Sequence, residues 1–80
     1  MTARVAALRT LTPQQLPHYL QKAATLAVEG LPNSEIAARL GISEAAVANY
    51  LCATRRALGA RSQTHALVIV MQSGLCQEAA

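Results

Sequence analysis

The residues best equipped for chemistry in this chain are hydrogen-bonding and cationic side chains between positions 43 and 61. Asn49 has the donor and acceptor needed for a two-bond contact with adenine, and small alanines could meet thymine methyl groups. Arg55, Arg56 and Arg61 carry donors that bind phosphate oxygens. The sequence has no Ser/His/Asp set, no paired carboxylates and no glycine-rich phosphate loop. We therefore expect contact with DNA, and neither an enzyme nor a bound cofactor or metal.

A helix-turn-helix pattern would position these side chains. Ala37 is a small residue where two helices must approach closely, Gly41 permits a left-handed turn, and Ile42 is an apolar plug for the corner. Ser43 then caps the second helix, whose N-terminal part could enter the major groove. We expect a first helix over residues 34–40, capped by the Asn-Ser pair at its start, and a second helix that ends at about Leu58.

Proline and glycine divide the remaining chain into two further helices. Residues 12–15 have the form of an N-terminal capping box, which predicts a helix over residues 13–29. Pro17 should kink or restart that helix because it has no N–H to donate. A last helix is expected over residues 63–73, ended by Gly74. No segment has the alternating pattern of a strand, so the predicted fold class is all-α with four helices.

Length and charge indicate one small domain with a preference for polyanions. We expect the domain over residues 11–74, an N-terminal extension over 1–10 and a C-terminal tail over 75–80. The 80-residue chain carries a formal net charge of +3, with 14% charged residues. A basic balance favours nucleic acid as a partner, although three net charges are a modest excess.

The cysteines and the apolar runs indicate a cytoplasmic location. Cys52 and Cys76 are fewer than a disulfide scaffold of this size normally has, so we expect both to be reduced. Residues 1–10 contain two arginines that interrupt any signal-peptide core. The longest apolar run, over residues 66–71, is too short to cross a bilayer. We therefore expect no membrane partner.

The sequence GLPNSEIAARLGISEAAV at residues 30–47 resembles the core of the LuxR/GerE-type DNA-binding domain. The likeness extends over residues 11–73, from the Leu-Thr-Pro opening at residue 11 to the Arg-Ser-Gln-Thr segment at residue 61. The resemblance implies a four-helix domain in which the third helix, over residues 44–58, reads the major groove and the fourth forms a homodimer. Together, the residues and the resemblance give these expected DNA contacts: Ser43, Ala46, Ala48, Asn49, Cys52, Arg55, Arg56 and Arg61.

The expected recognition helix has less charge than the resemblance implies. Members of that family usually have Lys in place of Ala48, His in place of Tyr50, and basic residues near Cys52, Ala53 and Ala57. Two hypotheses therefore stay open. The chain is a dimeric, sequence-specific transcription regulator that binds double-stranded DNA, or it keeps this fold as an antiactivator that binds another transcriptional regulator.

The last helix is apolar around its whole circumference over residues 66–71. A helix on the surface of a monomer needs only one apolar stripe, so a second face is left over. Burial of that face in a two-fold dimer agrees with the resemblance. The expected dimerisation residues are Leu67, Val68, Ile69 and Met71.

Overall fold

The computed structural model describes residues 10–75, and these residues form helices and turns without a strand. The elements are the 3-10 helix η1 (Pro13–Gln15) and the α-helices α2 (His18–Val28), α3 (Asn33–Leu40), α4 (Glu44–Leu58) and α5 (Gln63–Gln72). The expected all-helical class is confirmed for this part of the chain. The expected extension and tail lie almost entirely outside the described residues. Between residues 10 and 75, no helix is long and apolar enough to cross a membrane.

The predicted first helix is in fact two elements separated by Pro17. The backbone leaves the helical conformation at Leu16, with ψ 148°, and α2 begins after Pro17 as its N-cap. Of the two effects expected from Pro17, the structure has the restart, because a proline cannot donate the backbone bond that a continuous helix needs here. The side chain of Gln21 reaches back and donates to the carbonyls of Gln14 and Leu16, at 3.1 and 3.0 Å.

The caps of the other helices follow the sequence with one exception. Ser43 Oγ accepts the backbone N–H of Ala46 at 3.0 Å, as predicted for the start of α4. The expectation for α3 was wrong, because its N-cap is Pro32 and neither Asn33 nor Ser34, which both lie inside the helix. The extended backbone of Pro32 already turns its carbonyl toward the amides of the first turn, so the helix begins one residue early.

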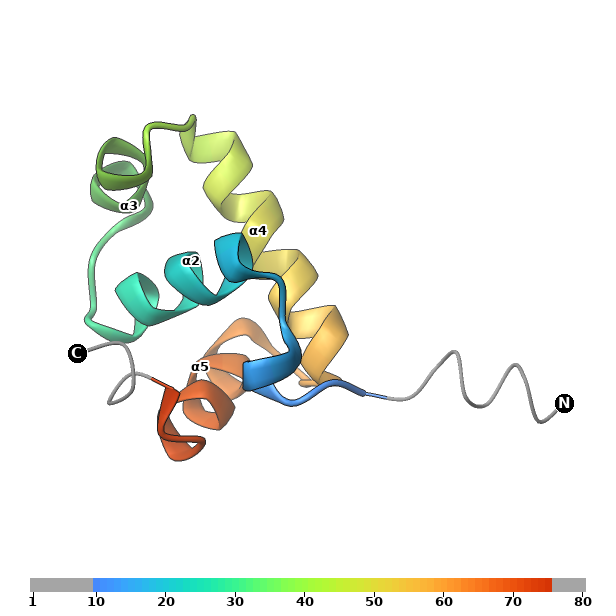
Figure 1. Ribbon diagram of the computed structural model, residues 1–80. Helices are drawn as coiled ribbons and strands as arrows, with labels where there is room; N and C mark the ends of the chain where they lie inside the picture. Colours follow the sequence, from blue (N-terminus) through green and yellow to red (C-terminus); the bar gives the residue numbers. More distant parts are fainter. Residues whose placement is uncertain (1–9, 76–80) are drawn as a thin grey trace, which may run out of the picture.

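The core consists of two clusters that share helices α2 and α4. One cluster joins α2 and α4 to α5, and the other joins α2 and α4 to α3. In Figure 1, α3 and α5 accordingly lie toward opposite ends of α4, with α2 between them. The buried members of the first cluster are Leu16, Leu20, Ala24, Leu58, Ala60, Ala66, Val70 and Leu75. Those of the second are Ala23, Ile36, Ala37, Val47 and Leu51.

Candidate nucleic-acid interface

The corner between α3 and α4 has the geometry that the sequence predicted. Gly41 ends α3 in the left-handed conformation, with φ 70°. The N–H of Ile42 donates to the carbonyl of Ala37 at 3.0 Å, and the half-buried Ile42 side chain packs against the second cluster. Ala37 is itself buried, which lets the two helices approach closely. The helix-turn-helix therefore fixes the start of α4 relative to α3.

Helix α4 buries one side and exposes the other. Its buried residues are Val47, Leu51, Thr54 and Leu58. Because successive side chains turn by about 100° around a helix axis, Asn49 and Arg56 lie on the opposite side. We call this side, defined by Ala45, Ala48, Asn49, Cys52, Ala53 and Arg56, the outward face of α4.

The structure distributes the predicted DNA contacts unevenly around this face. Ser43, Ala48, Asn49 and Arg56 are exposed. Cys52 is half-buried within the outward face, and Ala46 is half-buried at its edge toward the core. The structure therefore brings the polar Asn49 and the cationic Arg56 together on one face, with small side chains around them.

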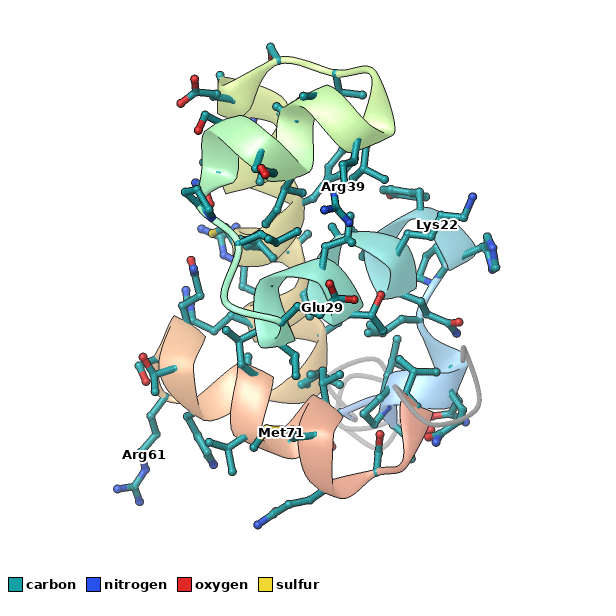
Figure 2. All side chains as sticks on the ribbon, turned by 90° about the vertical axis from the view of Figure 1, so that its left-hand side faces the viewer. Lys22, Glu29, Arg39, Arg61 and Met71 are labelled. Carbon is teal, nitrogen blue, oxygen red and sulfur yellow. The ribbon has the colours of Figure 1, made fainter. Side chains whose placement is uncertain are left out.

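The three predicted arginines differ in their surroundings. Arg56 is exposed, whereas Arg55 is half-buried and its Nη1 donates to the carbonyl of Ala60 at 3.4 Å. Arg61 is exposed just before α5, and Figure 2 shows it extending away from the lower part of the molecule. Part of the Arg55 side chain is thus used to close the C-terminal end of α4.

Two residues of α4 that were not predicted as DNA contacts also shape this region. Glu44 is exposed in the first turn of α4, where its negative charge suits the helix dipole but would face approaching phosphates. Thr54 is 1% exposed and donates its hydroxyl to the carbonyl of Tyr50 at 2.9 Å. A threonine can enter a helical core in this way because the residue four positions earlier accepts its proton.

Helix α5 also has a buried and an outward side. Ala66 and Val70 are buried, while Val68 and Met71 are 37% and 57% exposed. Leu67 and Ile69 are half-buried, and Ile69 packs against the first cluster. The spare apolar surface expected from the sequence is therefore present, but Val68 and Met71 form most of it. We call Thr64, Val68 and Met71, which follow one another at helical spacing, the outward stripe of α5.

The described residues offer little for metal or redox chemistry. Within residues 10–75, no group of three or more His, Cys, Asp or Glu side chains could hold a metal ion. Cys52 is a half-buried free thiol, and Cys76 lies outside the described part of the chain.

Comparison with known proteins supports a helix-turn-helix protein. The chain is 46% identical over 50 residues to the response regulator RamR of Streptomyces coelicolor, a match that covers 62% of this chain and 25% of that protein. The chain thus spans about a quarter of the length of this relative. No solved structure matches the chain.

A family model matches the part of the chain that contains the helix-turn-helix. The model of Sigma-70, region 4, matches residues 5–58, which include η1, α2 and the helix-turn-helix of α3 and α4. The match ends where α4 ends, so α5 lies beyond it. With the relative, this match supports a DNA-binding domain of a transcription regulator. The chain belongs to the family of Sigma-70, region 4.

Proposed function

We propose that this chain is a sequence-specific transcription regulator of the LuxR type, which binds double-stranded DNA with α4 in the major groove. The observation that carries the proposal is the outward face of α4, presented by a helix-turn-helix with a well-formed corner. Small alanines keep this face narrow, so that the Asn49 amide can approach a base edge. Residues of this kind specify sequence, whereas arginines chiefly fix the position of the protein on the duplex.

The residues of this interface have separate roles. Asn49 contacts adenine, and Ala48 with Ala46 and Cys52 meets thymine methyl groups or the walls of the groove. Arg56 binds a phosphate, with Arg61 and the Ser43 hydroxyl as further backbone contacts. Arg55 is a weaker phosphate ligand, because its guanidinium also bonds the carbonyl of Ala60.

We further propose that the regulator is a homodimer that pairs through α5. The outward stripe of α5 and the neighbouring Leu67 and Ile69 are apolar enough to form a self-complementary interface. Two copies would present two α4 helices to the two halves of a palindromic site. Pairing would also double the number of phosphate contacts, which compensates for the low charge of each α4. We place this dimer in the cytoplasm, without catalytic activity.

One observation favours a second function. The outward face of α4 carries a single cation, Arg56, and Glu44 stands at its start. This low charge, together with the apolar outward stripe of α5, also suits a protein-interaction module, such as an antiactivator that binds another transcriptional regulator through α5.

Selection of DNA fragments by the purified protein distinguishes the two functions. Genomic duplex fragments are incubated with the protein at low and moderate salt, and the bound fragments are sequenced. The expected result is a shared palindromic site that is still enriched at moderate salt. At one position of this site the preference for adenine should depend on Asn49. Absence of enrichment with folded protein would contradict DNA reading and would support the antiactivator.

A further inference from the structure

A groove opens where the start of α2, the end of α3, the turn and the middle of α4 meet. It has a volume of about 280 Å³ and is lined by Tyr19, Lys22, Leu40, Ile42 and Tyr50. Figure 2 shows Lys22 in the upper part of the molecule with α3, whereas Met71 lies on α5 in the lower part. The groove is thus separate from the outward stripe of α5. We call it the tyrosine groove.

Two aromatic rings form one wall of the tyrosine groove. The rings of Tyr19 and Tyr50 meet edge to face, with their centroids 5.0 Å apart and their planes at 65°. Tyr50 is half-buried against both core clusters, which holds its ring in place. Tyr19 is 53% exposed, so part of its ring is accessible to a partner. Paired, partly exposed tyrosines are typical of surfaces that bind another protein.

The open shape of the groove favours a peptide over an enclosed small molecule. Pockets for drug-sized ligands are about 300–1,000 Å³ and enclose most of the ligand. The tyrosine groove lies at the lower end of this range and is open to solvent, so it would not enclose such a ligand. Its dimensions suit one or two apolar side chains that project from a helix, as in proteins that bind a helical peptide in a groove.

The charge around the groove favours an acidic peptide. Lys22 is one of the five lining residues, and none of the five is acidic. Exposed Arg39 precedes the lining residue Leu40, and Figure 2 shows it in the upper part of the molecule with Lys22. Glu29, in contrast, follows α2 at its far end. An apolar groove with Lys22 in its lining, and with Arg39 on the adjoining helix α3, complements apolar anchors flanked by carboxylates.

We propose that the tyrosine groove binds an acidic amphipathic helix of another protein. Leucine-like side chains of that helix, one turn apart, fill the space beside Tyr19 and Tyr50, and its carboxylates face Lys22 and Arg39. Tyr50 is turned by about 100° from Asn49 around the axis of α4. None of the five lining residues is assigned to DNA contact, so the inference does not rest on the proposed DNA reading.

The intrinsic fluorescence of the protein reports directly on this groove. The chain has two tyrosines and no tryptophan, and both tyrosines line the groove. The probe is a short helical peptide without aromatic residues, with two leucines one turn apart and glutamates beside them. We expect a saturable change in tyrosine emission of the full chain. A peptide with lysine in place of each glutamate should bind about 10-fold more weakly.

Matched variants test the two parts of the groove, with affinities measured by the anisotropy of a dye-labelled peptide. Tyr19→Ala should weaken binding about 10-fold, as expected for an aromatic anchor, and Tyr19→Phe should retain it. Lys22→Gln should weaken binding about 3-fold, consistent with the energy of an exposed ion pair. The control Gln63→Glu changes the net charge equally at an exposed site on α5 and should leave peptide binding unchanged.

Several results would overturn the proposal. One is the absence of saturable binding, and another is equal affinity for the lysine peptide. A third is unchanged binding by folded Tyr19→Ala protein, with helicity checked by circular dichroism. Displacement of the peptide by duplex DNA would assign the groove to the nucleic-acid interface instead. A failure of DNA binding alone would leave the result of the peptide titration as it stands.

Discussion

Helices α4 and α5 begin in the same way and differ in what they present to solvent. Each has a serine N-cap whose hydroxyl accepts an amide of the first turn, Ser43 from Ala46 at 3.0 Å and Ser62 from His65 at 3.1 Å. Each buries one side in the core. The outward face of α4 consists of small side chains with Asn49 and Arg56, whereas the outward stripe of α5 contains Val68 and Met71. Local sequence signals thus start both helices, and the outward residues decide what each can bind.

The largest effect is expected from removing the apolar character of α5. Met71→Glu should raise the dissociation constant of the dimer by at least about 100-fold, because two apolar side chains worth roughly 1.5–3 kcal/mol each would leave the interface. Sedimentation equilibrium measures the change. Gln63→Glu, which adds a carboxylate at an exposed position at the start of α5, is the matched control. An unchanged dissociation constant in Met71→Glu would contradict pairing through α5, and with it the proposed difference between α5 and α4.

The next effect concerns the polar centre of the outward face of α4. Asn49→Ala should lower affinity about 10-fold for the preferred base pair and leave other positions of the site unchanged, because only the two-bond contact with adenine is lost. Competition binding against sites with each base substituted measures this loss. A uniform loss at every position would show that Asn49 contacts the backbone instead of a base.

The two adjacent arginines of α4 provide a comparison within one helix. Arg56→Ala should weaken DNA binding about 5-fold and reduce the slope of log affinity against log salt by about 1 per protomer, because one phosphate contact is lost. Arg55→Ala should have the smaller effect on DNA and should also lower stability, since its side chain bonds the end of α4. Anisotropy titrations at several salt concentrations, with urea unfolding, measure both. A larger loss of DNA affinity in Arg55→Ala than in Arg56→Ala would contradict the roles proposed for the two residues.

The smallest effect is expected from the serine N-caps that α4 and α5 share. Ser43→Ala and Ser62→Ala should each lower the free energy of unfolding by about 1 kcal/mol, because each removes one side-chain acceptor from a first turn. Urea denaturation measures both losses. Aspartate at either position is the control, as it restores an acceptor at the N-cap. A much larger loss in one variant would show that its serine has a tertiary role beyond the cap.

The sequence predicted most of the fold because capping and apolar spacing are local. The turn at Gly41, the Ser43 cap of α4 and its end at Leu58 were all expected and are found in the structure. The single helix over residues 13–29 was not found, because the choice between a kink and a restart at Pro17 depends on where the chain packs next. Two tertiary hydrogen bonds accompany the restart: the Leu11 N–H donates to the carbonyl of Ala57, and the side chain of Gln14 donates to that of Ser73.

Which side of α4 faces solvent was predictable from the sequence, whereas the surroundings of its side chains were less so. Exposure of Asn49 and Arg56 follows from the apolar stripe on the other side of α4. The difference between Arg55 and Arg56 could not be read in the same way, because it depends on the path of the chain after Gly59, which brings the carbonyl of Ala60 within reach of Arg55. The tyrosine groove was also missed, since Tyr19 and Tyr50 are far apart in sequence and only the packing of α2 on α4 joins them.

The sharing of α2 and α4 between the two core clusters has a consequence for how the protein opens. Helix α3 contributes to one cluster alone and α5 to the other, whereas α2 and α4 contribute to both. Either outer helix can therefore detach while the α2–α4 pair keeps its apolar contacts in the other cluster. We expect amide hydrogen exchange to be slowest in α2 and α4, with α3 and α5 exchanging as two separate units. Identical exchange free energies in all four helices would instead show that the domain opens only as a whole.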